Sequence, residues 1–256
     1  MSEPDFLQRM FRLDGRRALV TGGARGLGLA AAVGLARAGA SVTVVSRTRH
    51  ELEEACHLIG STGGLADYSV LDVTDSAAVT AFIGSRLPYD VLVNNAGINR
   101  PKLLTETPDV DIDDVLDLNV KATFYMCREV ARKLQSSNLG GSIINVTSQM
   151  GHVGSPRRTV YCASKHAIEG MSKALAWELG AGGIRVNTVC PTFIETELTA
   201  GMFKDRRFLD WVVERIALGR LGRIDEVVGP IVFLASEASS LMTGSALMLD
   251  GGWTAA

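Results

Sequence analysis

The chain has 256 residues, of which 46% are hydrophobic and 21% charged, with a formal net charge of −2. This length suits one large α/β domain or two small ones, and the weak charge excludes the electrostatics of nucleic-acid or membrane-surface binding. Scattered cysteines, an acidic start without a signal segment and the lack of a long apolar run predict a cytoplasmic protein with reduced thiols and no membrane span.

Short apolar runs alternate with amphipathic stretches along the chain. The expected strands are 18–20, 42–45, 68–71, 91–94, 142–146, 185–189 and 246–249. Helical periodicity is found at 49–59, 76–86, 112–134 and 161–179. This alternation predicts an α/β fold, a doubly wound parallel sheet with helices on both faces. No linker or change of composition divides the chain, so residues 1–256 are expected to form a single domain.

A glycine-rich turn separates the first strand from a run of helix formers and reads Thr21-Gly22-Gly23-Ala24-Arg25-Gly26-Leu27-Gly28. A helix N-terminus that follows such a turn is an anion-binding site. In a dinucleotide site, Gly22 would form the tight turn, Gly26 would let the backbone approach the pyrophosphate, and Gly28 would allow close packing. Glycines alone fit a purely structural turn equally well. No Gly-Lys-Ser/Thr follows, which excludes a P-loop.

Tyr161 and Lys165 lie one helical turn apart and therefore share a helix face. A phenol normally titrates near pH ~10, and a neighbouring cation lowers that pKa. A tyrosine primed in this way is a usable general acid or base. The pair alone would also fit a solvated helix face, and the glycine-rich turn favours the catalytic interpretation.

Four motifs occur in a fixed order: Thr21-Gly22-x-x-x-Gly26-x-Gly28, Asn94-Asn95-Ala96-Gly97, Ser148 and Tyr161-x-x-x-Lys165. In this respect the chain resembles the compact, single-domain branch of the short-chain dehydrogenase/reductase family, from about residue 11 to residue 253. The resemblance implies a seven-stranded Rossmann-type sheet and a homotetramer, although a dimer stays open.

The resemblance also implies a catalytic group of Asn119, Ser148, Tyr161 and Lys165. Tyr161 would exchange a proton with the substrate oxygen, and Ser148 would hydrogen-bond the same oxygen. Lys165 would lower the pKa of Tyr161 and hold the nicotinamide ribose. Asn119 would interrupt its helix locally and hold a water that relays protons to Lys165.

The end of the second strand predicts the cofactor. Ser46, Arg47 and Thr48 stand where an acidic residue would hold the ribose hydroxyls of NAD, and Arg25 adds a second cation in the glycine-rich turn. Arginine pairs bidentately with phosphate, so NADP(H) is favoured and NAD(H) stays possible. Arg49 is expected to face solvent.

By resemblance, further positions line the cofactor. Asp72 and Val73 would meet the adenine, and Asp75 is at least as good a helix cap as Asp72, which leaves Asp72 freer for the ligand. Asn95 would stabilise the sheet, whereas the remaining positions would contact the ribose, pyrophosphate or nicotinamide: Leu27, Ala96, Gly97, Pro191, Ile194 and Thr196. Thr192 replaces a glycine that the family usually has, which makes its backbone conformation a point to test.

The substrate is expected to contact Ser148, Met150, His152 and Tyr161, with Asn99, Gln149, Phe193 and Met202 as further pocket candidates. Segment 195–216 fits either a substrate lid or an ordinary surface helix pair. No histidine has metal-ligand spacing, so no metal is expected.

The predicted function is hydride transfer between NADP(H) and a secondary alcohol or ketone, as in a carbonyl reductase or an alcohol or polyol dehydrogenase. The alternatives are a 3-oxoacyl reductase and a non-catalytic NADP(H)-sensing binding protein on the same fold.

Overall fold

A parallel sheet forms the centre of the computed structural model, which describes residues 6–196, 199 and 201–255. In this part of the chain the sheet has seven strands in the order β3-β2-β1-β4-β5-β6-β7. The strands are β1 (Arg17–Thr21), β2 (Ser41–Ser46), β3 (Leu65–Val70), β4 (Val91–Asn94), β5 (Gly141–Val146), β6 (Ile184–Pro191) and β7 (Ala246–Leu249). The order reverses between β1 and β4, and ligands of open α/β sheets bind at the carboxyl edge beside such a point.

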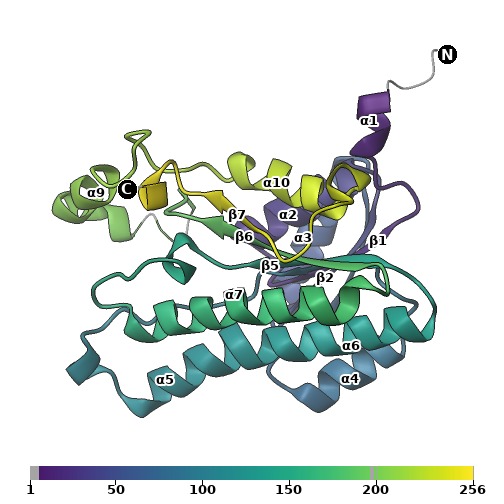
Figure 1. Cartoon of the computed structure of the whole chain (residues 1–256), viewed down its shortest axis with the longest axis horizontal. Coiled ribbons are helices and arrows are strands. Elements are labelled where there is room, and N and C mark those ends of the chain that lie inside the picture. The colour runs from purple at the N-terminus through teal and green to yellow at the C-terminus, as the bar shows by residue number, and fades with distance from the viewer. Residues whose placement is uncertain (1–5, 197–198, 200, 256) are drawn as a thin grey trace.

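Helices cover both faces of the sheet (Figure 1). On one face lie α2 (Gly26–Arg37), α3 (Arg49–Ser61) and α10 (Asp225–Ala235), and on the other α4 (Ser76–Gly84), α5 (Asp109–Leu116), α6 (Ala122–Ser136) and α7 (Thr159–Gly180). Each face has its own hydrophobic core, one around Leu35 and Ile59 and the other around Met126 and Ile143. Strands buried on both sides must be apolar throughout, and this explains the short apolar runs. The predicted doubly wound fold is confirmed.

Most predicted boundaries lie within two residues of the observed ones, and two predicted elements differ by more. Strand β3 begins at Leu65, three residues before the predicted start, because it is an edge strand with exposed and polar positions. The predicted helix 112–134 is divided into α5, a π-helical turn at Asp117–Lys121 and α6. Asn119 lies in that turn, so the predicted local interruption at this residue is confirmed. π-Helical turns inside α-helices are frequent at functional sites.

The expected lid segment packs beside the start of α7. Residues 197, 198 and 200 lie outside the described residues, and the rest contains the short helix Met202–Lys204 and α9 (Arg206–Val213). An aromatic cluster joins this segment to Tyr161, and its other aromatic members are Phe193, Phe203, Phe208, Trp211 and Trp253. Figure 1 shows α9 at the edge of the molecule beside the end of the chain.

Two further sequence expectations concern the whole chain. The four cysteines, Cys56, Cys127, Cys162 and Cys190, are free. Within the described ranges, none of the helices, including the N-terminal α1 (Phe6–Met10), combines the length and apolar character that a membrane crossing requires.

Candidate active site

The glycines of the turn between β1 and α2 have the properties that the spacing predicts. Gly22 adopts a φ of +61°, and a Cβ there would lie 3.1 Å from Ala96 Cα. A Cβ on Gly28 would lie 2.1 Å from Gly22 O, so no side chain fits at this position. Gly26 adopts a φ of +54°, and no described atom beyond its chain neighbours lies within 4 Å of the position that a Cβ would take there. The turn is therefore closed where helix and strand meet and open where a pyrophosphate would approach.

The same turn is fastened to the end of β4. Asn95 Nδ2 donates to Thr21 O at 3.2 Å and to Gly22 O at 3.1 Å. Thr21 Oγ1 accepts hydrogen bonds from the backbone N–H groups of Asn95 and Ala96, at 3.0 and 3.1 Å. Helix α2 begins without a side-chain cap on its first N–H groups. A fixed loop before uncapped N–H groups is suited to a phosphate.

Basic residues surround the end of β2. Arg47 is exposed, Thr48 N donates to Ser46 Oγ at 3.3 Å, and Arg25 lies 3.8 Å from the carboxylate of Glu51. Arg49 is exposed, as expected, and its guanidinium donates to Tyr68 Oη at 3.2 Å. Arg25, Arg47 and Arg49 are thus all exposed cations, of which Arg25 pairs with Glu51 and Arg49 with Tyr68.

Of the two aspartates after β3, Asp75 is a helix cap, as predicted. Asp75 caps α4 by accepting from Ala77 N at 2.9 Å and Ala78 N at 3.0 Å. Asp72 Oδ1 accepts hydrogen bonds from the hydroxyl and the backbone N–H of Thr74. The pKa of Asp72 is lowered, mainly because of the hydrogen bond from the Thr74 hydroxyl. The charge of Arg47 acts in the same direction. Asp72 is therefore an exposed carboxylate beside the basic end of β2, next to buried Val73.

Asn119 fixes the backbone that follows the Asn94–Gly97 motif. Its Oδ1 accepts from Ile98 N at 2.8 Å, and its Nδ2 donates to Ile98 O at 2.9 Å and to Ser164 Oγ at 3.0 Å. Ser164 Oγ in turn donates to Tyr161 O at 2.7 Å. A Cβ on Gly97 would lie 3.1 Å from Asn119 Oδ1 and 3.8 Å from Lys165 Nζ. Asn119 thus lies beside Lys165 and couples the π-helical turn to α7.

Ser148 follows the end of β5, and the side chain of Lys165 on α7 reaches the same end of that strand. Ser148 Oγ accepts from Met150 N at 3.1 Å and donates to Gln149 Oε1 at 2.7 Å. Lys165 Nζ donates to Val146 O at 2.9 Å. Burial lowers the pKa of Lys165 to about 8, because a charged amine loses hydration in the protein interior.

The electrostatics around Tyr161 differ from the sequence prediction. Burial raises the pKa of this phenol above its usual value, and a hydrogen bond with Ser148 and the charge of Arg158 oppose the rise. Lys165 Nζ lies 5.6 Å from the Tyr161 ring centroid and is directed to Val146 O, so it does not lower the pKa here. The expectation that Lys165 lowers the Tyr161 pKa is therefore wrong for this structure. Tyr161 is a protonated phenol at neutral pH.

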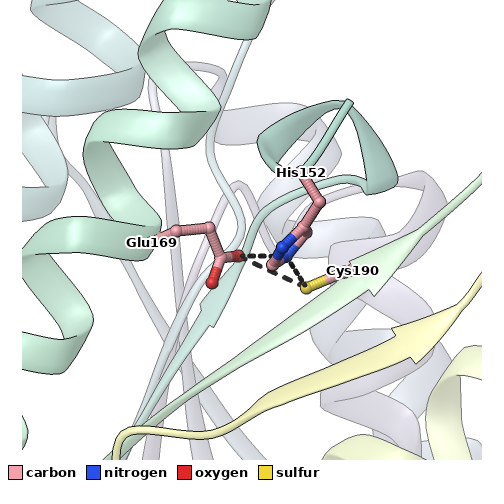
Figure 2. A group of neighbouring side chains, drawn as sticks. All are labelled: His152, Glu169 and Cys190. Atoms are coloured by element: carbon pink, nitrogen blue, oxygen red, sulfur yellow. Dashed lines mark hydrogen bonds and ion pairs between the residues drawn. The ribbon is translucent and has the colours of Figure 1, made fainter. Parts of the chain in front are cut away.

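His152 lies in a cluster that its sequence spacing does not reveal (Figure 2). Its Nε2 is 3.4 Å from Glu169 Oε1 and 3.5 Å from Cys190 Sγ. The Cys190 thiol donates to Glu169 at 3.3 Å, and the hydroxyls of Thr147 and Thr188 donate to the same carboxylate at 2.6 and 3.0 Å. His152, Glu169 and Cys190 each offer one ligand atom, and these atoms lie within 4.8 Å of one another, an arrangement that could hold a metal ion and that histidine spacing along the chain does not reveal.

The end of β6 forms the wall where the nicotinamide positions are expected. Pro191 is buried, and Thr192 N donates to Leu249 O at 3.1 Å without adopting a positive φ. Threonine therefore replaces the family's glycine at this position without backbone strain. Ile194 packs into the core, so only its backbone is available to a ligand. Thr196 exchanges hydrogen bonds with Thr199 at 2.9 and 3.2 Å.

Buried polar atoms without a partner among the described residues indicate that the site fits a ligand. They include Thr192 Oγ1, next to Pro191, and Gln149 Nε2, next to Ser148. Asn99 Oδ1, just after the Asn94–Gly97 motif, is a third. Buried polar groups normally have partners. With the open Gly26 loop, these atoms fit a nicotinamide dinucleotide and a polar substrate.

Three residues of the site were not predicted to act there. Arg158 is buried beside Tyr161, whereas Glu169 and Cys190 surround His152. The positions of Arg158 and Glu169 carried a signal, because both lie at helical spacing from Tyr161 and Lys165. Cys190 had none, since its role depends on how β6 pairs with β5.

A Rossmann-type sheet with a phosphate-binding glycine turn and a Tyr, Lys, Ser and Asn group at its carboxyl edge defines a dinucleotide-dependent oxidoreductase. The family model described as Enoyl-(Acyl carrier protein) reductase matches residues 22–254. A gluconate 5-dehydrogenase of Gluconobacter oxydans is 40% identical over 99% of this chain and 99% of that protein. A D-erythrulose reductase of Gallus gallus is 38% identical over 98% of both chains.

A solved structure agrees with these relatives. The crystal structure of a gluconate 5-dehydrogenase from Burkholderia cenocepacia, in complex with NADP and tartrate, superposes with a TM-score of 0.94. The two sequences are 37% identical, and the superposition covers 98% of this chain and 99% of the Burkholderia chain. The chain therefore belongs to the short-chain dehydrogenase/reductase family, as its motifs predict.

Proposed function

We propose that the chain transfers a hydride between NADP(H) and a polyhydroxylated ketone or the corresponding secondary alcohol. The observation that carries this proposal is the grouping of Tyr161, Ser148, Lys165 and Asn119 beside an open phosphate-binding turn. Its relatives act on compounds of this kind by name: gluconate 5-dehydrogenase, D-erythrulose reductase and L-xylulose reductase.

The cofactor supplies the hydride, and the chain's own residues handle the substrate oxygen and its proton. Tyr161, a protonated phenol, donates its proton to the carbonyl oxygen during reduction. Ser148 exchanges its bond to Gln149 for a bond to the same oxygen and stabilises the charge that develops there. Lys165 holds the nicotinamide ribose hydroxyls. Asn119 positions α7 through Ser164 and holds the water that relays protons to Lys165.

NADP(H) is the cofactor that the basic end of β2 selects. Arg47 and Arg25 bind the 2′-phosphate, and Ser46 and Thr48 contribute hydroxyls. Three similar crystal structures contain bound NADP. Asp72, Val73 and the Asn95–Gly97 segment line the adenosine half of the same groove.

A substrate screen tests the function. Purified protein with NADPH is mixed with ketoses, sugar-derived keto acids, a 3-oxoacyl thioester and a simple ketone, and NADPH absorbance is followed. We expect turnover with the hydroxylated ketones at a kcat of roughly 1–10³ s⁻¹. Turnover confined to the thioester would instead favour a 3-oxoacyl reductase, a class represented among the relatives at 38% identity. NADPH binding without turnover of any substrate would indicate a sensing protein.

Residues 1–256 act as one cofactor-binding and catalytic domain, in which segment 195–216 is the substrate lid. The hydrophobic cluster that Phe208 and Trp211 share with Tyr161 supports this role over an ordinary surface helix pair. Met150, Phe193 and Met202 give the pocket an apolar wall, whereas His152 and Gln149 give it polar contacts. The free thiols suit a reducing compartment, and we place the chain in the cytoplasm.

The outer face of α7 supports a homotetramer. Ala163, Ala167, Gly170 and Ala174 are exposed on this helix, and Trp177 at the end of the same stripe is 91% exposed. Small residues let another helix approach closely, and the spacing of four and three residues is that of a helix-packing seam. A second copy of the chain would bury this face in a symmetric interface.

Replacing Trp177 with Glu is expected to break the assembly, because it removes a large apolar side chain from the proposed interface and places a charge there. Light scattering should give the wild type a mass four times the 27.3 kDa of one chain and the variant a smaller multiple. The control is Leu65→Glu in edge strand β3, where Leu65 is 71% exposed and lies away from α7. A monomer mass for the wild type would contradict the proposed tetramer.

A further inference from the structure

Arg158 is a buried cation in an aromatic environment. Only 6% of this residue is exposed, and its guanidinium carbon lies 5.5 Å from the ring centroid of Phe193 and 5.6 Å from that of Phe208. Among the residues that the structure describes, no carboxylate or hydrogen-bond acceptor pairs with its side chain. Burial without an anionic partner lowers the pKa of Arg158. Arginine is almost never fully buried unless it is paired.

The two aromatic rings do not satisfy this guanidinium. Cation–π contacts act through the flat faces of the guanidinium and leave its edges without partners. Its five N–H donors lie in the guanidinium plane and need acceptors. Removing an ion from water is costly even after relaxation of the protein, and the ring contacts alone do not replace the lost hydrogen bonds. Arg158 therefore keeps a preorganised, partly desolvated fork of donors for a planar anion.

The position of Arg158 indicates where that anion comes from. Arg158 is the residue before α7, and its charge is felt by the phenol of Tyr161. Both aromatic partners of Arg158 belong to the cluster that also contains Tyr161 and Met150. An anion held by Arg158 therefore belongs to the molecule whose oxygen Tyr161 protonates. The 2′-phosphate of the cofactor has its own cations, at the end of β2.

We propose that Arg158 binds the carboxylate of the substrate, so that the pocket is built for a hydroxy acid and its keto form in preference to a neutral polyol or ketose. This inference rests on the proposed oxidoreductase function and specifies its substrate class. A carboxylate matches the guanidinium bidentately, which fixes the orientation of the carbon chain relative to Tyr161. The bond should form in the desolvated space between Phe193 and Phe208, where charge-assisted hydrogen bonds are strongest.

A structural role is the competing explanation. Arg158 contacts both Phe193 after β6 and Phe208 on α9, and through these contacts it could position the lid. A structural role of this kind would change the affinities for charged and neutral ligands of the same shape equally, whereas a carboxylate site would discriminate between them. Tartrate and threitol provide this pair, because both are four-carbon molecules with two central CHOH carbons, and they end in carboxylates and in hydroxymethyl groups respectively.

The experiment measures dissociation constants of tartrate and threitol for the NADPH-saturated full chain, from ligand-dependent thermal shifts at matched ionic strength. This readout needs no turnover, so it stays informative if the substrate screen fails. Inhibition constants against a reducible ketone give a second measurement. The variants are Arg158→Met, which keeps the apolar stem, and Arg158→Lys, which keeps the charge without the fork. Arg157→Met is the matched control, since Arg157 is exposed and adjacent.

The wild type should bind tartrate about 10- to 100-fold more tightly than threitol, the range that hydrogen bonds to a charged group provide. Arg158→Met should remove this difference, Arg158→Lys should retain part of it, and Arg157→Met should leave it unchanged. Equal affinities in the wild type would overturn the proposal, even if Arg158→Met failed to fold. A preference for tartrate that survives in a folded Arg158→Met variant would also overturn it.

Discussion

Replacing Tyr161 with Phe is expected to lower kcat by about 10²–10⁴-fold, the contribution typical of a positioned general acid. The substitution removes one hydroxyl and keeps the ring that packs beside Met150 and Phe193. Because burial keeps the Tyr161 phenol protonated, the wild type always has the proton that a carbonyl oxygen must receive during reduction.

Turnover and NADPH binding must be measured together for this variant. We expect NADPH fluorescence titrations of Tyr161→Phe to match the wild type, which separates lost chemistry from lost binding. Tyr125→Phe is the matched control, because it removes a phenolic hydroxyl from α6, outside the catalytic group. If the Tyr161→Phe variant folds normally and keeps wild-type turnover, the assignment of Tyr161 as the proton donor is wrong.

Replacing Arg47 with Ala is expected to raise KM for NADPH about 10- to 100-fold, because it removes charge-assisted hydrogen bonds to the 2′-phosphate. KM for NADH should change little, since NADH has no phosphate at that position. The effect should be largest at low salt, because Arg47 is exposed and salt screens its charge.

Arg49→Ala is the control for this prediction. It removes a cation two residues away, one whose guanidinium is directed to Tyr68. We expect its KM for NADPH to stay near the wild-type value. If Arg47→Ala raised KM equally for NADPH and NADH, Arg47 would stabilise the loop and would not select the cofactor. If Arg47→Ala and Arg49→Ala raised KM for NADPH equally, the effect would be a general electrostatic one.

Most of the fold followed from the alternation of apolar runs and helical stretches. Central strands such as β4 and β5 were located well because strands buried on both faces must be apolar. Edge strand β3 was placed less well, because Leu65 and Val70 are exposed and the strand has no uniform pattern. The π-helical turn at Asn119 could be anticipated only from the family resemblance, since amphipathic periodicity runs through it without a break.

The site was predictable where the backbone determines chemistry and less so where side-chain direction does. The roles of Gly22, Gly26 and Gly28 follow from their spacing, and each position has the expected space around it. The electrostatic relation between Tyr161 and Lys165 could not be predicted, because sequence spacing does not show that Lys165 Nζ is directed to Val146 O.

Arg158 was missed for a related reason. Charged residues are usually solvated, and its burial depends on two aromatic rings from distant segments. The same applies to His152, whose contacts with Glu169 and Cys190 join a loop, a helix and a strand (Figure 2).

A crystal structure of the chain with NADP⁺ and a hydroxy acid substrate tests the central claim most directly. The account predicts the Tyr161 hydroxyl within hydrogen-bond reach, about 2.6–3.2 Å, of the alcohol oxygen, whose carbon faces the nicotinamide ring. It also predicts the glycine-rich turn on the pyrophosphate. A substrate oxygen bound away from Tyr161, or a phenol that faces solvent with the cofactor in place, would contradict the account.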